Sequence, residues 1–446
     1  MFQIAPQKFK NNHKNVLKGA LFSSLGTVVS SVINVILIGI AVRALPKEMS
    51  GVYFLCLNFS AFILLADIGL SPTLSREIAF SLGNLDAVKG QKRIKVLLRT
   101  AIHLLFVATL ISFFAALLIG WFYFSQTVSD EYQSQVMFAW TIFALGSALN
   151  LFSLSGFAGL YGLGFVPIER TGRIIGQLIG LLLSIVAVYL GLGLLGLCFA
   201  WLGQGLAMCI IGWSLLIRKQ PTIIIGKVDF DNSLSKEILA KSSRWGLTSL
   251  GGFLIFNATN FMIGYYLSAK AVSDFSLIVR MAQPIQSIGL AMTVSAIPHI
   301  SREYAAGNSP EVTRILIRNL QIGMMIVTIP LFLIGIFAPK ILQIWVGEGH
   351  FAGYEVLIPY LVMIVLDTHH VIHASAVMAT GDLPFAPWAI GSGILTIIFG
   401  VLFIPNFGLL GASLSLMIAQ LLTNNWYVPY FSYFKFFHNI GRVKKM

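Results

Sequence analysis

The sequence has 446 residues, of which 57% are hydrophobic and only 11% are charged. Soluble domains usually carry about a quarter charged residues, so this composition excludes a water-soluble globular protein and predicts an integral membrane protein. The formal net charge is +13, but membrane proteins concentrate Lys and Arg on their cytoplasmic side. The excess of basic residues is therefore explained by their position on the cytoplasmic side, and no nucleic-acid partner is predicted.

Twelve apolar runs follow one another along the chain, each long enough for a transmembrane helix. The runs are continuous and do not alternate with polar residues, so they predict helices and not the strands of a barrel. The predicted fold class is an all-α membrane protein with about twelve transmembrane helices. The predicted spans are 17–42, 50–70, 100–124, 136–160, 174–192, 194–217, 246–267, 275–299, 319–338, 356–379, 387–405 and 407–430.

Basic residues mark alternate connections between these spans. If the N-terminus is cytoplasmic, most of the 30 Lys and Arg fall in the cytoplasmic tails and loops, and few fall in the outer loops. A wrong span count would remove this asymmetry. We therefore expect a multi-pass protein with both termini in the cytoplasm.

Short motifs recur in the same order in the two halves of the chain. The matches are Ser23–Gly26 with Thr248–Gly251, Ser75–Glu77 with Ser301–Glu303, and Gly193–Gly196 with Gly408–Gly411. Six spans per half return the chain to the same side, so the halves are expected to be parallel repeats around a central cavity. The expected domains are an N-terminal six-helix bundle over 1–217, a cytoplasmic linker over 218–245, and a C-terminal six-helix bundle with a basic tail over 246–446.

Several charged residues lie at the predicted cytoplasmic ends of spans. Asp67 ends the second span; it either bonds the nearby backbone or Arg76, or acts as an ionisable coupling or gating group. Arg76 and Arg302 are related by the repeat, and are either ordinary positive-inside residues or a pair that captures an anionic headgroup. Arg170 and Arg173 are further candidates for headgroup binding.

Arg280 lies within the predicted eighth span, near its outer end. A charge at mid-depth costs about 2.5–3.5 kcal/mol or more, so charged residues inside spans often have a function. The side chain could reach the outer interface, or it could line the cavity and bind an anion such as a diphosphate. Guanidinium stays charged and can donate two parallel hydrogen bonds to phosphate oxygens.

The predicted tenth span contains Asp367, His369, His370 and His373. Asp367, His370 and His373 are three residues apart and therefore share one helix surface. They form either a proton-responsive cluster or a packed set of satisfied polar groups. His369 and His373 have the spacing of a helical metal pair, but no further ligands are evident, so no metal or cofactor is predicted.

Two segments resemble Wzx-type O-antigen flippases of the multidrug/oligosaccharidyl-lipid/polysaccharide exporter superfamily. They are Leu65–Glu77, with the sequence LADIGLSPTLSRE, and the Tyr161–Gly164 turn. The resemblance extends over the whole chain in topology. It implies that the protein carries an undecaprenyl-diphosphate-linked oligosaccharide to the outer leaflet of the bacterial inner membrane. It also implies a cationic cavity lined by spans 1, 2, 7 and 8, and ion coupling. With about twelve spans, the chain departs from the fourteen of lipid II flippases.

The expected partners are the lipid-linked oligosaccharide, the bilayer and other membrane proteins of polysaccharide assembly. No GxxxxGK[ST], HExxH or GxSxG motif occurs, so no enzyme is predicted. Two alternatives remain open: a drug or cation antiporter on the same fold, and a membrane-embedded glycan polymerase. An Arg in the cavity argues against the antiporter, and the repeat and short outer loops argue against the polymerase.

Overall fold

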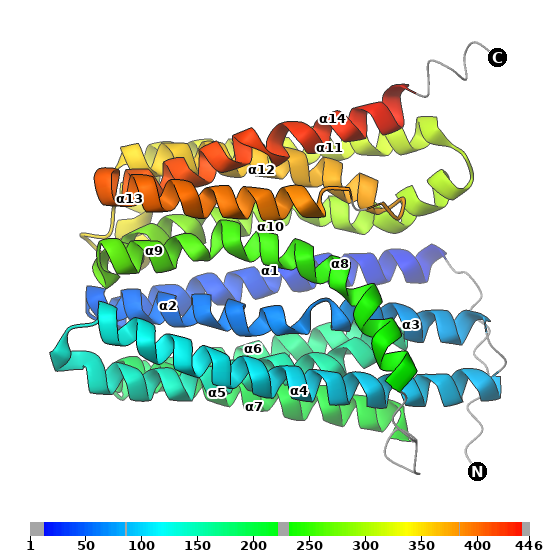
Figure 1. Ribbon diagram of the computed structural model, residues 1–446, viewed down its shortest axis with the longest axis horizontal. Coiled ribbons are helices and arrows are strands. Elements are labelled where there is room, and N and C mark those ends of the chain that lie inside the picture. Colours follow the sequence, from blue (N-terminus) through cyan, green and yellow to red (C-terminus); the bar gives the residue numbers. More distant parts are fainter. Residues whose placement is uncertain (1–12, 85–86, 222–231, 383, 439–446) are drawn as a thin grey trace.

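The protein is described here by a computed structural model that covers residues 13–84, 87–221, 232–382 and 384–438 (Figure 1). All regular elements in these ranges are helical, which confirms the predicted fold class. The α-helices are α1 (His13–Ala44), α2 (Lys47–Leu64), α3 (Leu70–Asn84), α4 (Ala87–Thr127), α5 (Asp130–Gly162), α6 (Val166–Tyr189), α7 (Gly193–Lys219), α8 (Asn232–Phe256), α9 (Ala258–Tyr266), α10 (Ala269–Ala305), α11 (Ser309–Val346), α12 (Tyr354–Met378), α13 (Ala386–Leu422) and α14 (Asn424–Tyr433). A 3₁₀ turn, η1 (Leu65–Asp67), follows α2, and a π-helical turn, η3 (Phe434–His438), follows α14.

Eleven segments of the described chain are long and apolar enough to cross a membrane. The last, Ala386–Phe436, has 51 residues and would be roughly 75 Å long as one straight helix, more than twice the hydrocarbon thickness. Its backbone is non-helical at Gly408, with φ 60° and ψ −137°, and the chain reverses direction there (Figure 1). This segment therefore supplies two spans, which gives the predicted twelve.

Several helices extend beyond the predicted spans. α4 has 41 residues, or roughly 60 Å, and begins at Ala87, although the third span was predicted to begin at residue 100. Its additional turns are rich in Lys and Arg, which form helices well in water. Similarly, α3 is helical where a loop was expected, and α8 begins at Asn232 within the predicted linker. The basic tails at 1–12 and 439–446 lie outside the described residues.

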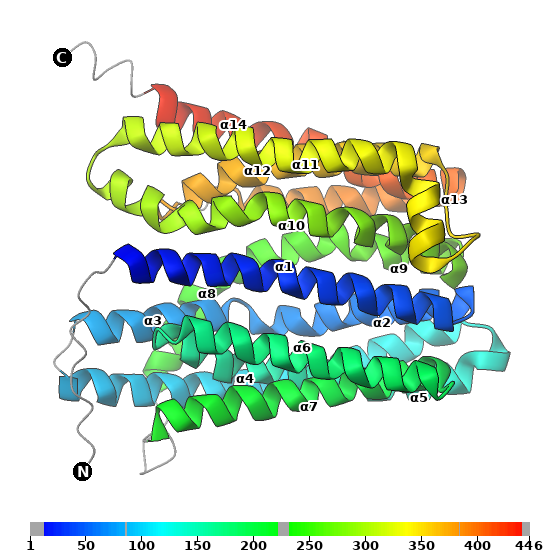
Figure 2. The same cartoon turned by 180° about the vertical axis from the view of Figure 1, so that it is seen from behind.

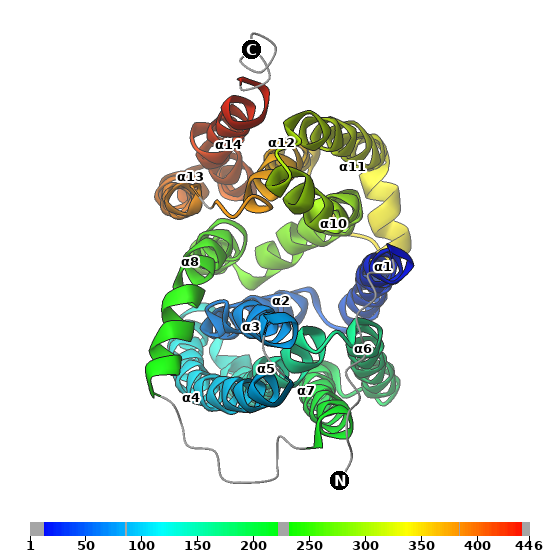
Figure 3. The ribbon, with the colours of Figure 1, turned by 90° about the vertical axis from the view of Figure 1, so that its right-hand side faces the viewer.

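The helices lie in two groups, α1–α7 and α8–α14, with their axes roughly parallel (Figures 1 and 2). α1 and α8 lie at opposite sides of the boundary between the groups (Figure 3). α1 contacts α6 and α10, and α8 contacts α3 and α13, so each packs on both groups. The end of the molecule where α1 begins, α7 ends and α8 begins is called the linker end, and the opposite end is called the loop end.

Two of the three repeated motifs occupy equivalent structural positions. The Ser75 hydroxyl donates to the Ala158 carbonyl near the end of α5 at 2.9 Å, and the Ser301 hydroxyl donates to the Ala379 carbonyl at the end of α12 at 2.6 Å. α5 and α12 carry the fourth span of their respective halves. The repeated segments Gly193–Gly196 and Gly408–Gly411 both begin with a glycine of positive φ, 57° at Gly193 and 60° at Gly408. Sequence repeat and structural repeat therefore coincide.

Two backbone breaks line one cavity between α2–α3 and α8–α9. The first separates α2 from α3, where Ile68 and Gly69 have φ values of 45° and 74°. The second lies at Asn257, between α8 and α9. Asn257 and the first break line the same cavity, so these irregular segments place polar groups inside the membrane region.

Candidate functional site

Arg280 lies deeper than the sequence suggested. α10 begins at Ala269, eleven residues before Arg280, so the Arg280 backbone is roughly 16 Å along the helix. That depth is near the middle of a hydrocarbon core about 30 Å thick. The predicted eighth span began later in the chain, at residue 275, and therefore placed Arg280 too close to the membrane surface.

The Arg280 guanidinium lies within electrostatic range of the hydroxyls of Tyr53 and Tyr360. Tyr53 belongs to α2 in the first group and Tyr360 to α12 in the second, so the electrostatic environment of Arg280 includes side chains of both groups. Both tyrosines are 1% exposed. None of the three side chains makes a hydrogen bond or ion pair with another described residue, and the Tyr360 hydroxyl is fully buried. We call this trio the central site.

The central site is chemically suited to an anion. A guanidinium has five N–H donors and no acceptor, and each phenol adds one O–H donor. Buried donors without partners are unfavourable by about 1–3 kcal/mol each, so a ligand rich in acceptor oxygens would stabilise this arrangement. The sequence did not identify Tyr53 and Tyr360, because single tyrosines within apolar helices are common in packed interiors.

Arg76, Arg170 and Arg173 line one cavity of about 480 Å³ near the linker end. We call it the arginine pocket. Glu169 is 3% exposed and forms ion pairs with Arg173 and, at 3.5 Å, with Arg170. The Arg173 guanidinium also lies 4.6 Å from the centre of the Phe157 ring. Three guanidinium groups against one carboxylate leave the pocket with an excess positive charge.

Arg302 does not join this pocket. It is exposed at the linker-end terminus of α10, in the other group of helices. Arg76 and Arg302 are thus equivalent in the repeat but lie on different groups. The structure brings together three of the five predicted arginines and leaves Arg302 and Arg280 at separate positions.

Asp67 lies in the break after α2 and holds the start of α3. Its Oδ1 accepts hydrogen bonds from the Ser71 amide at 3.1 Å and the Ser71 hydroxyl at 2.6 Å. Such bonds satisfy donors at a helix N-terminus. The side chain also lines a cavity of about 340 Å³ with residues of α8, which we call the Asp67 pocket.

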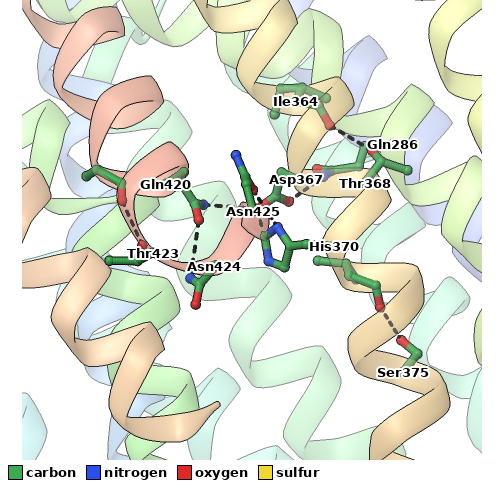
Figure 4. Close-up of polar contacts among 12 residues, drawn as sticks. Gln286, Ile364, Asp367, Thr368, His370, Ser375, Gln420, Thr423, Asn424 and Asn425 are labelled. Atoms are coloured by element: carbon green, nitrogen blue, oxygen red, sulfur yellow. Dashed lines mark hydrogen bonds and ion pairs between the residues drawn. The ribbon is translucent and has the colours of Figure 1, made fainter. Parts of the chain in front are cut away.

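Asp367 is the centre of a hydrogen-bond network that joins four helices (Figure 4). Its carboxylate accepts from Gln286 of α10 at 2.6 Å and from Gln420 of α13 at 3.0 Å. His370 places Nε2 3.7 Å from Asp367 Oδ1, and its Nδ1 lies 2.8 Å from Asn425 Oδ1 on α14. We call these residues the α12 network.

In the α12 network the imidazole of His370 faces the carboxylate of Asp367. An oxygen of Asn425 faces His370 Nδ1, so a neutral imidazole carries its hydrogen there and leaves Nε2 bare towards Asp367. A proton added to either group would form a hydrogen bond or ion pair between them. His373 lies apart from this pair and has Nδ1 3.0 Å from the Ser432 hydroxyl. No metal-binding cluster of three His, Cys, Asp or Glu occurs among the described residues.

The loop end carries a set of contacts between the two groups that the sequence did not reveal. Lys47 forms an ion pair with Asp274 at 2.8 Å and donates to the Gly349 carbonyl at 2.8 Å. Arg43 donates to the Trp345 carbonyl at 3.1 Å and to the Ile344 carbonyl. We call these contacts the loop-end clamp. They join the α1–α2 turn of one group to α10, α11 and the following loop of the other.

The loop between α11 and α12 adds a titratable group to the clamp. His350 Nδ1 lies 3.9 Å from Asp274 Oδ1. Burial, with a smaller contribution from the positive charge of Lys47, holds the pKa of His350 below its ordinary value of 6.5. The imidazole is therefore neutral at pH 7.

Comparison with known proteins identifies the family of this chain and structures that share its fold. The family model described as "Polysaccharide biosynthesis protein" matches residues 16–304, which is more than half of the chain. No curated protein matches the sequence. The chain is similar to the inward-facing conformation of a multidrug resistance MATE family transporter of the MOP superfamily, with 16% identity, a TM-score of 0.75, and coverage of 94% of this chain and 96% of the other.

Two further structures share the fold. An outward-facing conformation of a MATE family transporter has 19% identity and a TM-score of 0.67, with coverage of 93% and 95%. The lipid II flippase MurJ in an inward closed conformation has 13% identity and a TM-score of 0.70, with coverage of 92% of this chain and 87% of the other. The predicted exporter superfamily is confirmed. This multi-pass membrane protein belongs to the polysaccharide biosynthesis protein family and has the fold of the MOP superfamily.

Proposed function

We propose that the protein is a flippase that moves an undecaprenyl-diphosphate-linked oligosaccharide from the cytoplasmic to the periplasmic leaflet of the bacterial inner membrane. The observation that carries this proposal is the central site. Arg280, Tyr53 and Tyr360 present donors without partners among the described residues, at the boundary between two groups of helices. The family match supports a glycan-related substrate.

The substrate explains why such donors would lie inside the membrane. A diphosphate and a glycan are too polar to cross hydrocarbon unaided. The diphosphate offers acceptor oxygens that match one guanidinium and two hydroxyls. The lipid tail can stay in the bilayer while the headgroup passes between the helix groups. This role is transport and involves no bond breakage.

The arginine pocket is proposed as the entry point. Lys and Arg gather near the linker end, so we assign that end to the cytoplasm by the positive-inside rule. Arg76, Arg170 and Arg173 would attract the diphosphate there, and Arg302 would add positive charge from the other group. Arg280 would then receive the headgroup at greater depth.

The clamp supports an inward-facing state for the structure. It joins the groups at the loop end, while the arginine pocket lies near the linker end. The TM-score is also higher for the inward-facing than for the outward-facing MATE structure. In the proposed cycle, the α1–α7 group rocks against the α8–α14 group, and the clamp opens.

The α12 network is proposed to couple transport to a proton. Asp367 and His370 can share one proton, and their partners lie on α10, α13 and α14. Gln286 stands on the same helix as Arg280, so a change in the Asp367 charge can alter the packing of that helix. His373 and Asp67 would influence gating through their own helix contacts.

The deciding experiment replaces Arg280 with glutamine in a strain that lacks the chromosomal copy. Arg280→Gln removes the charge with little change in size. We expect loss of surface polysaccharide at low expression, with normal amounts of protein in the membrane. Arg314→Gln is the matched control, because Arg314 is exposed and pairs only with Glu311 among the described residues; it should leave the polysaccharide unchanged.

The same strains separate the proposal from an antiporter. A drug or cation antiporter would make the deletion strain more sensitive to organic cations and leave surface polysaccharide intact. A polymerase would change the chain length of the glycan and not its delivery. Normal polysaccharide in the Arg280→Gln strain would contradict the role of the central site.

A further inference from the structure

The Asp67 pocket has features that the diphosphate does not explain. One wall is the backbone break after α2, which carries Asp67. The other is a face of α8 followed by the second break, where Trp245, Ser249 and Asn257 recur at four- and eight-residue intervals. Residues at such intervals share one helix face. The cavity thus combines a carboxylate, an indole, a hydroxyl and an amide.

The polar groups of this pocket are available to a ligand. Asp67 Oδ1 is occupied by Ser71, but Oδ2 has only a long contact of 3.4 Å with the Ser71 amide. The side-chain polar atoms of Trp245, Ser249 and Asn257 make no hydrogen bond to any described residue. Trp245 is 36% exposed, so part of its ring can receive another molecule.

The pocket is held in shape by the strained backbone beside it. Ile68 has a φ of 45°, which is unfavourable for a β-branched residue. Gly69 follows with a φ of 74°, and a Cβ there would lie 2.5 Å from the Trp245 Cβ. Trp245 thus packs directly against the backbone break at Gly69. Strain kept at one position is a reason to look for a function there.

We propose that the Asp67 pocket binds a sugar ring of the lipid-linked glycan. Carboxylate and amide groups bond to sugar hydroxyls, and an indole packs its apolar face against ring carbons while its N–H still bonds. An organic cation would also suit an aromatic ring with a carboxylate. However, Arg173 lies within electrostatic range of Asp67 and reduces its attraction for cations.

The position of the pocket agrees with the covalent structure of such a substrate. In a lipid-linked glycan the first sugar is attached directly to the diphosphate, so the two binding sites must adjoin. The arginine pocket and the Asp67 pocket share Pro72 as a lining residue. This inference rests on the proposed flippase function, and it assigns the sugar and the diphosphate to different residues.

The test measures binding of two probes to the purified full-length protein in nanodiscs. The probes are undecaprenyl diphosphate and the same lipid carrying the oligosaccharide of the host strain. Asn257→Leu and Trp245→Leu should weaken binding of the glycosylated lipid by about tenfold, the loss expected for one well-placed contact. Binding of undecaprenyl diphosphate should change by less than about twofold in both variants.

Three variants control the experiment. Trp245→Tyr should restore much of the affinity because it returns an aromatic ring and a donor. Leu247→Ala changes an exposed residue on another face of α8 and should bind both probes normally. Arg173→Gln, in the arginine pocket, should weaken both probes equally.

The outcomes distinguish the two proposals. If Asn257→Leu and Trp245→Leu bind both lipids as the wild type does, the sugar site is wrong and the flippase proposal stands. If the wild type binds neither lipid, both proposals fail. Trp245-dependent binding of tetraphenylphosphonium, without binding of the glycolipid, would identify the pocket as a cation site.

Discussion

Replacing Gly51 with alanine is expected to prevent the loop end from closing. Gly51 lies in α2 and faces the start of α10, where a Cβ would lie 1.7 Å from the Ala269 carbonyl oxygen. An ordinary carbon–oxygen contact is about 3.3 Å or longer. The two helices would therefore have to separate by more than about 1.5 Å. The position of the Cβ is fixed by the backbone of residue 51 and its neighbour is a backbone carbonyl, so no side-chain rotation can relieve the clash.

The expected magnitude follows from this geometry. Overpacking in a dense interior costs about 1–3 kcal/mol, and a clash of a Cβ with a backbone carbonyl belongs at the upper end. About 3 kcal/mol changes the ratio of closed to open molecules by roughly 100-fold. The clamp bonds of Lys47 lie next to this contact and would lengthen with it, so they cannot offset the change.

The assay measures access of a membrane-impermeant maleimide to the boundary between the helix groups. Ser276→Cys is the reporter, in a background where the three native cysteines, Cys56, Cys198 and Cys209, are replaced. Ser276 is 1% exposed, and its hydroxyl lies 3.5 Å from Asn260 Oδ1. The reporter should react slowly in the parent protein and much faster with Gly51→Ala.

Gly391→Ala is the matched control, because a Cβ at Gly391 has no neighbour within 4 Å. It should leave the labelling rate unchanged. Slow labelling of the Gly51→Ala protein together with normal surface polysaccharide would refute the reasoning. That result would mean that α2 and α10 need not approach closely in the working protein.

Three other predictions concern the clamp and the α12 network. Lys47→Met removes the partner of Asp274 and should raise reporter labelling by up to about fivefold, since a partly exposed ion pair contributes about 1 kcal/mol. Unchanged labelling would exclude a clamp role. Because the pKa of His350 is lowered in the closed protein, the closed state loses stability as pH falls below 6.5. Labelling should therefore rise on acidification, and His350→Gln should weaken this response. Asp367→Asn keeps one acceptor for Gln286 but removes the carboxylate, so transport in proteoliposomes should lose its response to a proton gradient; a retained response would contradict coupling at this site.

The candidate site could be predicted only in part. Arg280 stood out because placing a charge inside an apolar span is energetically unfavourable, whichever way that side of the helix points. Asp367 and His370 stood out because their spacing places them on one helix surface. Their partners were not evident: Tyr53 and Tyr360 flank Arg280 from helices far away in the chain, and Gln286 reaches Asp367 from another helix.

The difference between the predictable and unpredictable features has a physical origin. Transfer into the bilayer depends on the composition of a single run of about 20 residues, so the number of spans, the repeat and the charge asymmetry can be read along the chain. Rotation of each helix about its axis depends on close packing with its neighbours. Contacts such as Gly51 against Ala269, or Lys47 with Asp274, follow from that rotation. These contacts form only when all the helices are assembled. They, and not the spans themselves, determine where a transport pathway can lie.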